Sequence, residues 1–328
     1  MKTAVVILNW NTRQYLQQFL PGLTQSVSGM DAEVVVADNA STDGSLDLVR
    51  EQFPQVRCIS LDKNYGFTGG YNRALAQIDA EYFVLINSDI EVTEGWLGPL
   101  EQWMDSHPEC GACGPKLLSF YQRDRFEYAG AAGGLMDRWG YTYCRGRIMS
   151  RTAVDSGQYD SPASVMWVTG ACLMVRSALW KKLGGLDDRF FAHMEEIDFC
   201  WRLQLQGYKV QVVPQSIVYH LGGGTLPQNS PWKLKLNYRN NLLLLDNNLA
   251  LSKGKTRAAM VIRWRLLLDR CSQMVYWLKG QKEYVKAVSE AHDEFRKMRK
   301  PADGRSGRCR IDGLSGKIMF IEFLKRNI

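Results

Sequence analysis

Residues 82–92 read YFVLINSDIEV, a continuous apolar run that stops at three polar residues. Five successive apolar side chains, residues 82–86, are typical of a strand that is buried on both faces of a parallel sheet. Asn87, Ser88 and Asp89 therefore stand at the carboxyl end of this strand, where open α/β sheets bind their ligands. Two interpretations follow: Asp89 caps the next turn, or Asp89 holds a cation.

The same pattern recurs before residue 82. Apolar or β-branched runs lie at residues 3–9, 32–38, 55–61 and 81–87, and helical patterns begin near residues 12, 43 and 69 between them. Strands that alternate with helices of about 10–15 residues indicate βαβ units and a mostly parallel α/β sheet. The strands end on Asn9, Asp38, Asp62 and Asn87. Polar side chains are therefore expected along one edge of the sheet.

At 328 residues the chain is long enough for one large domain or two smaller ones. Hydrophobic residues make up 45% of it and charged residues 23%, which is the composition of a globular protein. No apolar run approaches the roughly 18 residues that are typical of a transmembrane helix. Residues 1–11 fit a first strand better than a signal peptide, because no small-residue cleavage site follows them.

Most of the eight cysteines lie in apolar segments, where a thiol behaves as a small hydrophobic group. Cys110 and Cys113 have the C-x-x-C spacing, but no second pair at zinc-site spacing accompanies them. We therefore expect ordinary core or loop cysteines in a reducing, cytoplasmic compartment.

Basic charge is concentrated in the last part of the chain. Residues 231–328 contain 22 Lys and Arg against 9 Asp and Glu, whereas residues 1–230 contain 19 against 25. The acidic residues 1–230 and the basic tail, residues 231–328, are therefore expected to bind different partners.

The basic tail is predicted to be helical, and aromatic and leucine residues are interleaved with Lys and Arg in residues 232–300. The residues of this pattern include Trp264, Leu266, Leu267, Leu268, Tyr276 and Trp277. Such a composition suits an amphipathic helix on an anionic membrane surface or against a lipid-linked ligand. Packing on the rest of the chain, or in a homodimer, is the alternative. We expect no nucleic-acid partner.

A glycine-rich segment precedes the third predicted helix. Residues 63–74 read KNYGFTGGYNRA, and glycines before a helix allow backbone N–H groups to approach a phosphate. The segment has neither the G-x-G-x-x-G spacing of dinucleotide folds nor the G-x-x-x-x-G-K-[ST] spacing of P-loops. It therefore predicts a nucleotide that is bound by another route.

Acidic residues open a later predicted helix, residues 195–207. Glu195, Glu196 and Asp198 lie in its first turn, where the helix dipole favours negative charge. Asp198 is also placed to form an ion pair with Arg202 one turn later. Taken singly, these acids have a sufficient structural explanation.

Taken together, the order of these segments closely resembles the family 2 glycosyltransferases. The segments are ILNWN, VVVADNASTDGS, NYGFTGGYNRA, FVLINSDI, VTGACLMVR, GGLDDRFFAHMEEIDFCWRL and VYHLGGGT. Within the family the chain looks like the bacterial rhamnosyltransferase-like and galactofuranosyltransferase-like group over residues 1–245. The resemblance implies a GT-A fold with a Rossmann-like sheet. It implies a catalytic domain at residues 1–230, with a nucleotide-sugar half (1–90) and an acceptor half (91–230), and a basic helical region at 231–328.

The resemblance also implies roles for individual residues. Residues 87–89 stand where the family carries its D-x-D motif, so Asp89 is an implied ligand of Mn²⁺ or Mg²⁺. His220 is implied as a second metal ligand, and the glycines of the LGGG that follows it can bring backbone close to a phosphate. MEEID matches the family's acidic segment, which supplies the general base as Glu195 or Glu196.

The remaining implied residues fall into two groups. Those that bind the nucleotide are Asn9, Trp10, Asn11, Asp38, Asn64, Gly66, Phe67, Asn72, Asn87 and Ser88. Those that bind the acceptor are Thr169, Gly170, Ala171 and Asp198.

The implied activity is inverting transfer of a sugar from a dTDP-, UDP- or GDP-linked donor. The acceptor is a hydroxyl of a saccharide or lipid-linked saccharide, in the assembly of a cell-surface polysaccharide. The enzyme is expected in the cytoplasm, with the inner face of the membrane as its peripheral site. A sugar-nucleotide pyrophosphorylase is one alternative, although NWNTRQ after the first strand lacks the glycine of that class. A non-catalytic saccharide-binding relative is another, although the acids at 89, 195 and 196 are present.

Overall fold

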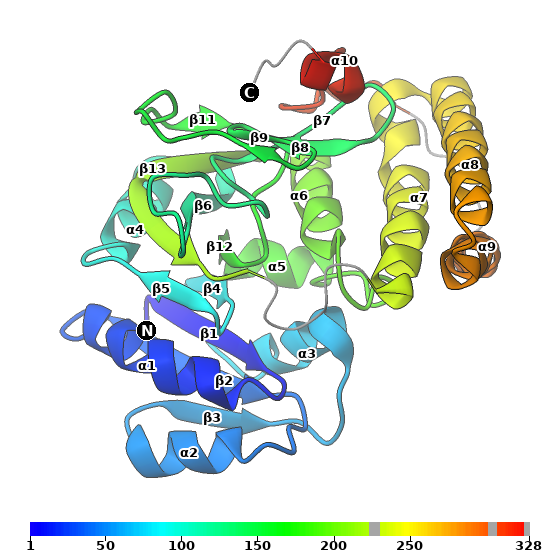
Figure 1. Cartoon of the computed structure of the whole chain (residues 1–328). Coiled ribbons are helices and arrows are strands. Elements are labelled where there is room, and N and C mark those ends of the chain that lie inside the picture. Colours follow the sequence, from blue (N-terminus) through cyan, green and yellow to red (C-terminus); the bar gives the residue numbers. More distant parts are fainter. Residues whose placement is uncertain (223–229, 301–306, 325–328) are drawn as a thin grey trace.

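The computed structural model describes residues 1–222, 230–300 and 307–324, and a nine-stranded mixed sheet forms its centre (Figure 1). The strand order is β11-β13-β6-β12-β4-β1-β2-β3, and β5 pairs with β13. The four strands of the first ninety residues are all parallel. They are β1 (Thr3–Asn9), β2 (Ala32–Asp38), β3 (Arg57–Ser60) and β4 (Tyr82–Ile86). The predicted α/β fold is confirmed.

Three helices connect these parallel strands: α1 (Arg13–Ser26), α2 (Ser45–Gln52) and α3 (Gly66–Leu75). Helix α3 begins at Gly66, three residues before the predicted start at Gly69. The N–H groups of Phe67 and Thr68 both donate to the carbonyl of Phe191, at 2.8 and 3.2 Å. A distant loop therefore supports the first turn of α3, which a local sequence pattern does not reveal.

An antiparallel strand, β12 (Cys172–Arg176), pairs with β4 and with β6, and so joins the two halves of the sheet. The other strands of this half are β5 (Ile90–Val92), β6 (Cys110–Ser119), β11 (Ala163–Ser164) and β13 (Lys209–His220). A separate four-stranded sheet contains β7 (Gly134–Met136), β8 (Thr142–Cys144), β9 (Arg147–Ile148) and β10 (Arg151–Thr152).

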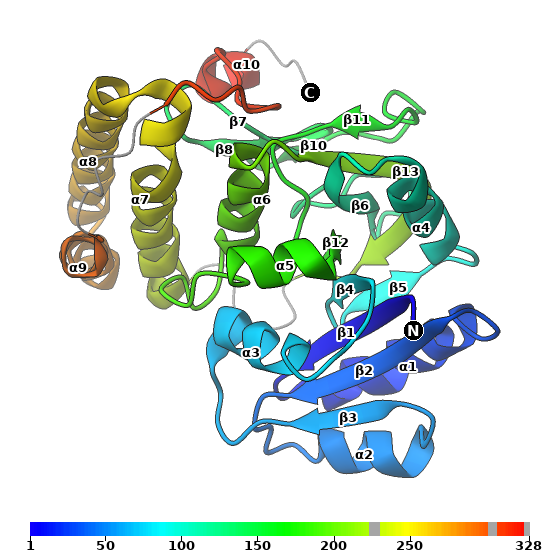
Figure 2. The same cartoon turned by 180° about the vertical axis from the view of Figure 1, so that it is seen from behind.

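Helices cover both faces of the large sheet and form the C-terminal region. They are α4 (Leu97–Ser106), α5 (Ser177–Leu183), α6 (Glu195–Leu205), α7 (Pro231–Lys253), α8 (Lys255–Leu278), α9 (Lys282–Met298) and α10 (Met319–Leu324). Helix α7 stands next to α6, and α8 lies outside α7 at the edge of the molecule in both Figure 1 and Figure 2. The predicted helical region is therefore present and packed on the sheet domain.

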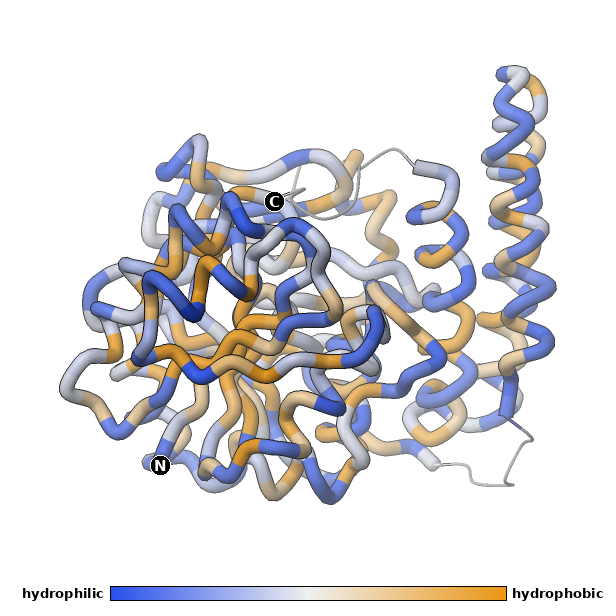
Figure 3. The backbone as a smooth tube through the Cα atoms, turned by 90° about the horizontal axis from the view of Figure 1, so that it is seen from below, coloured by the Kyte–Doolittle hydropathy of each residue, from blue (hydrophilic) through white to orange (hydrophobic). Residues whose placement is uncertain are grey.

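Strand β4 contributes to both faces of the sheet. Phe83 and Leu85 join one buried cluster, and Val84 and Ile86 join the other. Alternation along a strand with no polar face produces this pattern. In the tube coloured by hydropathy, apolar segments run through the middle of the molecule, whereas the helices on the right mix apolar and hydrophilic residues (Figure 3).

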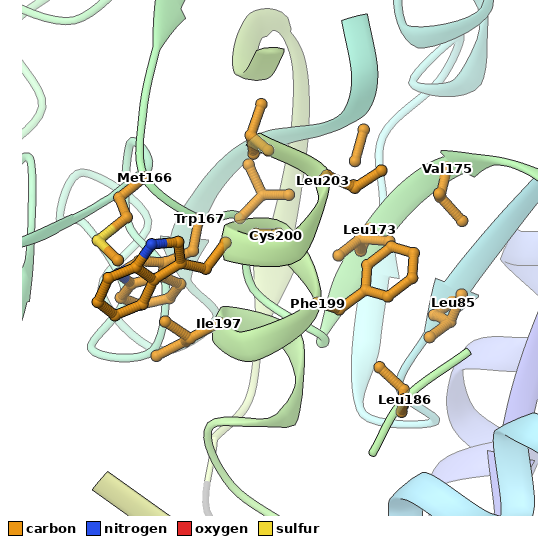
Figure 4. Close-up of a cluster of buried hydrophobic side chains, with 14 of the residues drawn as sticks. Leu85, Met166, Trp167, Leu173, Val175, Leu186, Ile197, Phe199, Cys200 and Leu203 are labelled. Carbon is orange, nitrogen blue, oxygen red and sulfur yellow. The ribbon is translucent and has the colours of Figure 1, made fainter. Parts of the chain in front are cut away.

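Helix α6 is held on the sheet by its apolar side. Phe199 and Leu203 lie against strand residues, among them Leu173, in the cluster of Figure 4. The same buried cluster includes the α7 residues Leu242, Leu243, Leu244, Leu245 and Leu249. The sheet, α6 and α7 therefore share one core.

The described cysteines are all free thiols, and six of the eight are buried or half-buried. Cys110 and Cys113 both lie within β6, so the C-x-x-C pair is part of a core strand. None of the described helices combines the length and the apolar character that crossing a membrane demands.

Replacing Phe199 by alanine should destabilise the fold strongly. The ring is fully buried, and such truncations cost about 3–5 kcal/mol through lost transfer energy and the cavity that remains. Urea unfolding followed by circular dichroism measures the change. Tyr121→Ala removes a ring that is 73% exposed and is the matched control. Equal unfolding midpoints for the two variants would contradict the assignment of α6 to the core.

Candidate active site

The site lies at the carboxyl ends of β1, β2 and β4 and continues along α6. Asp89 follows β4, and His220 ends β13. Because β5 pairs with the end of β13, with Ile90 opposite His220, the residue before β5 is brought next to the imidazole. Asp89 Oδ1 lies 3.3 Å from His220 Nε2, and both side chains are 7% exposed. The pairing of these two predicted metal ligands is a consequence of sheet topology.

Glu127 is on the other side of the imidazole, with Oε2 at 3.4 Å from His220 Nδ1. Burial opposes protonation of His220, but the neighbouring carboxylates of Asp89 and Glu127 outweigh it and raise its pKa to about 10. A second carboxylate on the far nitrogen is also the arrangement that orients an imidazole toward a metal. Glu127 was absent from the sequence interpretation, because the segment FEYAG has no strand or helix pattern.

A divalent cation fits between Asp89 and His220. The distance of 3.3 Å between the donor atoms is close to the about 3.0 Å between neighbouring ligands of an octahedral ion. Within residues 1–222, 230–300 and 307–324, no three His, Cys, Asp or Glu side chains converge as a metal cluster. The remaining ligands would therefore have to come from the bound diphosphate and water.

Asn9 and Asp38 come together at the ends of β1 and β2, as predicted. Asn9 Nδ2 donates to Asp38 Oδ1 at 2.7 Å and to Ser45 Oγ at 2.7 Å. The second Asp38 oxygen accepts from the N–H of Ser41 at 3.0 Å. Asn9 and Asp38 are buried, so they form the floor of this region.

Trp10 and Asn11 form the exposed part of the same corner. The indole of Trp10 is 38% exposed, which leaves a large apolar surface beside the strand end. Asn11 has a φ of 54° and accepts a hydrogen bond from Thr42 N–H at 2.7 Å. The structure therefore brings the first predicted cluster and the segment after β2 into one surface.

The segment before α3 uses most of its polar groups within the protein. Asn39, a residue that the sequence interpretation missed, donates to Asn64 Oδ1 and accepts from Tyr65 N–H, both at 3.0 Å. The N–H of Gly66 donates to Asn64 Oδ1 at 2.8 Å. Because the next two N–H groups bind Phe191, these donors are not directed to a phosphate, contrary to the expectation from the glycines.

Asn72 also has partners that give it a structural role. Its amide nitrogen donates to the Leu186 carbonyl and to Asp188, both at 2.8 Å, and its oxygen accepts from Leu186 N–H at 2.9 Å. The side chain thus ties α3 to the loop that precedes α6.

Glu195 and Glu196 are the first two residues of α6. Within the described part of the chain, one carboxylate oxygen of each is buried without a hydrogen-bond partner. Burial, with the charge of Glu196, raises the pKa of Glu195 well above its usual range. Burial also raises the pKa of Glu196 to about 7, against the opposing effect of nearby backbone N–H groups such as that of Gly170. Both carboxyls are therefore weaker acids than usual, and the backbone N–H groups around Glu196 favour its ionised form.

Residues 169–171 lie between the two acidic centres. The N–H of Asn87 donates to the carbonyl of Ala171 at 3.0 Å, and Thr169 Oγ1 accepts from Ala171 N–H at 3.2 Å. A Cβ placed on Gly170 would lie 3.2 Å from Phe67 and 3.6 Å from Glu196. The absence of a side chain at Gly170 thus lets the segment after β4, the start of α3 and the start of α6 approach one another.

The backbone immediately before the two glutamates is strained. Phe191, His193 and Met194 have φ values of 64°, 72° and 70°, in the left-handed region that non-glycine residues avoid. Such residues cost about 1–3 kcal/mol each and persist where the surroundings over-determine them. The burial of His193 lowers its pKa to about 4, so its imidazole is neutral at pH 7.

Two residues of α7 hold this strained loop in place. Asn240 Nδ2 lies within 2.7–3.0 Å of the carbonyl oxygens of Phe190, Ala192 and His193. Arg239 donates to the Phe190 carbonyl at 2.8 Å and to Asn240 Oδ1 at 2.9 Å. Both side chains are buried. The sequence interpretation did not assign these residues a part in the site.

Asp198 has a structural role, because its carboxylate is fully buried. It accepts from Arg202 Nε at 2.7 Å, from Asn248 at 2.8 Å and from Asn247 at 3.0 Å. The ion pair with Arg202 that the spacing indicated is present. The side chain is 0% exposed, so its described partners are all within the protein. Of the LGGG segment, Gly223 and Gly224 lie outside the described residues.

The family model described as Glycosyl transferase family 2 matches residues 4–167, half of the chain. The chain belongs to glycosyl transferase family 2. An N-acetylglucosaminyl-diphospho-decaprenol L-rhamnosyltransferase of Mycobacterium tuberculosis is 27% identical over 278 residues, which cover 80% of this glycosyltransferase and 88% of the relative. The low-salt glycan biosynthesis hexosyltransferase Agl10 of Haloferax volcanii is 22% identical, with 73% and 74% covered.

Solved structures share the GT-A fold of this family 2 glycosyltransferase. The mannosyltransferase PcManGT from Pyrobaculum calidifontis, in complex with GDP-Man and Mn²⁺, superimposes with a TM-score of 0.57 at 13% identity and covers 91% of this chain and 88% of its own. S. aureus TarS 1-349 in complex with UDP-GlcNAc has a TM-score of 0.57 at 17% identity, with 90% and 82% covered.

Asn240→Ala should lower the turnover of the glycosyltransferase about tenfold or more. The strained loop would lose its amide donor, and a displacement of about 1 Å in a reacting group costs on the order of 10²-fold. Steady-state kinetics at saturating donor, together with thermal unfolding, separate misplacement of the loop from loss of the fold. Asn237→Ala, three residues earlier on α7, is the matched control. If both variants turned over alike, the proposed support of the loop would be wrong.

Proposed function

We propose that this family 2 glycosyltransferase transfers a sugar, with inversion, from a nucleoside diphosphate donor to a hydroxyl of a saccharide or lipid-linked saccharide. The observation that carries the proposal is the approach of Phe67 and Glu196 to Gly170, where a Cβ would lie 3.2 and 3.6 Å from them, next to the hydrogen bond from Asn87 N–H to the Ala171 carbonyl. This approach places the carboxylate of Glu196, which can take up a proton, near the carboxyl end of β4, which would hold the diphosphate.

The nucleotide is proposed to bind over the ends of β1, β2 and β4. Trp10 offers an exposed ring for contact with the base, and the Asn9–Asp38 pair offers buried polar groups below it. The residues that we retain for the nucleotide are Asn9, Trp10, Asn11, Asp38, Asn64, Gly66, Phe67, Asn87 and Ser88. A GT-A fold and exposed polar groups at this sheet edge support the site.

Asp89 and His220 are proposed to hold a divalent cation, with Glu127 orienting the imidazole. Bound there with the diphosphate, the cation would act as a Lewis acid on the charge that develops as the leaving group departs. A nitrogen ligand favours Mn²⁺ over Mg²⁺, which prefers oxygen. The Mn²⁺ named for the Pyrobaculum mannosyltransferase is consistent with this choice.

Glu196 is proposed as the general base that deprotonates the acceptor hydroxyl. Its pKa of about 7 lets it be ionised at neutral pH and still hold a proton well, which is the property that a general base needs. Glu195, whose pKa is raised by burial and by the charge of Glu196, would hold a proton beside it. Thr169, Gly170 and Ala171 line the approach to this pair and are retained as acceptor-binding residues.

The relatives favour particular substrates within this class. The name of the mycobacterial relative gives it L-rhamnose as the transferred sugar and a decaprenyl-diphosphate-linked acceptor. The O-antigen biosynthesis protein RfbC of Myxococcus xanthus, 28% identical over 194 residues, is named for cell-surface polysaccharide. We therefore propose a deoxyhexose or hexose donor linked to dTDP, UDP or GDP and a lipid-linked acceptor. The enzyme would then be a peripheral protein at the cytoplasmic face of the membrane. The alternative is that its basic helical region packs in a homodimer.

The alternatives to a glycosyltransferase are a sugar-nucleotide pyrophosphorylase and a non-catalytic binding protein. Titrations with nucleoside diphosphates, with and without Mn²⁺, help to distinguish them. A pyrophosphorylase would release nucleoside triphosphate from the donor and pyrophosphate, and a binding protein would bind without turnover. A screen of donor hydrolysis across nucleotide sugars identifies the donor.

The transfer rate should rise with pH through 7. Glu196 acts only when deprotonated, so a pKa of about 7 predicts a rate about tenfold lower at pH 6 than at pH 8. Glu196→Gln should lower the rate at pH 8 by about 10²–10⁴-fold and remove its rise with pH. Glu195→Gln, the same change one residue earlier, should lose less and keep the pH profile. A flat wild-type profile, or near wild-type rates for both variants, would refute the assignment.

His220→Ala should raise the Mn²⁺ concentration needed for half-maximal turnover at least tenfold and reduce the preference for Mn²⁺ over Mg²⁺. Calorimetry of Mn²⁺ binding in the presence of UDP checks the same loss without turnover. His107→Ala, which removes an imidazole stacked on Trp103, is the control. An unchanged metal requirement in His220→Ala would return this histidine to a structural role.

A further inference from the structure

Helix α8 exposes a continuous apolar stripe. Its members follow one another at intervals of four and three residues, which places them on one side of the helix. They are Met260, Trp264, Leu267, Cys271, Met274 and Leu278. Leu267 is 50% exposed and Leu278 is 72% exposed. The opposite side, which includes Val261 and Arg265, is buried against the neighbouring helices.

The charges on this face are positive. Arg263, Arg270 and Lys279 are exposed beside the stripe. The acid in the sequence of α8 is Asp269, which is buried and lies 3.2 Å from His292 and 3.7 Å from Arg265. The exposed face of α8 therefore presents apolar and cationic groups without an anionic one.

A basic hollow continues the stripe at the start of α8. It has a volume of about 690 Å³ and shares Met260 with the stripe. Among the described residues, those with a cationic side chain that line it are Lys253, Lys255, Arg257 and Arg308, and none with an acidic side chain does. The positive end of the α8 dipole adds to this potential.

We propose that this face, the stripe with its basic hollow, is a docking surface for an anionic lipid bilayer. Bilayers supply hydrocarbon for the stripe and headgroup phosphates for Arg263, Arg270 and the hollow. A second copy of the chain fits less well, because packing stripe on stripe would bring these cations together with no acid between them. The ring centroids of Trp264 and Trp139 lie 5.6 Å apart. This contact orients the indole of Trp264 on the exposed face, where an aromatic side chain at a membrane–water interface is expected.

The location of α8 agrees with this proposal. It forms the outer edge of the molecule, with α7 between it and the sheet, in both views of Figures 1 and 2. The proposal goes beyond the transfer reaction, because no residue of this face belongs to the candidate active site. It explains why the exposed side of a helix keeps tryptophan and leucine, which would otherwise favour aggregation.

The test is flotation of the full chain with vesicles of phosphatidylcholine, with and without phosphatidylglycerol, at low and high salt. We expect binding to the anionic vesicles that weakens as salt rises. Leu267→Glu/Met274→Glu and Arg263→Glu/Arg270→Glu should each reduce the bound fraction at least tenfold. Tyr121→Glu and Lys286→Glu make the same kinds of substitution, one at a time, at exposed residues outside α8 and should bind like the wild type.

Three outcomes would overturn the proposal: no binding of the wild type to anionic vesicles, no loss in the α8 variants, or equal loss in the controls. Analytical ultracentrifugation tests whether a second copy of the chain occupies this face. A wild-type dimer that Leu267→Glu/Met274→Glu makes monomeric would show that the chain itself occupies the face. Hydrolysis of the sugar nucleotide without vesicles is measured in parallel, so that a loss of docking is distinguished from a failure of the proposed activity.

Discussion

The buried carboxylate of Asp198 is the charge on which the relation of α6 to α7 depends. An ionised group with 0% exposure is stable only if it is paired and hydrogen-bonded, and Asn247, Asn248 and Arg202 meet that need. Two of these partners belong to α7, so the position of that helix is fixed against α6. Arg202 also donates to the carbonyls of Leu183 and Gly185, which extends the network to the end of α5.

With α7 fixed, Arg239 and Asn240, about two turns earlier on this helix, can hold the backbone that precedes the glutamates. Three left-handed residues at about 1–3 kcal/mol each oppose this conformation. The hydrogen bonds from Asn240, from Arg239 and from the first turn of α3 contribute about 0.5–1.5 kcal/mol each. The two sums are of similar size, so the loop keeps its shape only while α3, α6 and α7 are all in position. The orientation of Glu196 therefore depends on elements from three parts of the chain.

The sequence predicted the parallel half of the sheet because its strands have strong and local signals. Residues 82–86 are apolar throughout, and polar side chains follow at the strand ends, so Asn9 and Asp38 were expected to meet and do. The contact of Asp89 with His220 required the pairing of β5 with β13, which are far apart in sequence. Family resemblance suggested both residues, but no local pattern could have placed one beside the other.

Other side chains have structural partners that spacing does not reveal. Asn72 follows the glycines of α3 but turns to Leu186, and Asp198 shares the first turn of α6 with the glutamates but turns to α7. Glu127 and Asn240 lie outside the segments that carried obvious chemistry. Asn240 had a weak signal, since an asparagine pair in a leucine-rich helix is costly to bury without a partner.

The core that the sheet, α6 and α7 share has a consequence for any recombination of this protein. The start of α7 looks in the sequence like a natural point for exchange with another C-terminal region. Severing the chain there would leave α6 and the sheet without Leu242, Leu243 and Leu244, which are all fully buried. Two or three such leucines contribute several kcal/mol, a large share of the about 5–15 kcal/mol that stabilises a domain. A chimera that keeps this enzyme's sheet must therefore keep its α7, and with it α8 and α9, because Val261 and Phe295 belong to the same core.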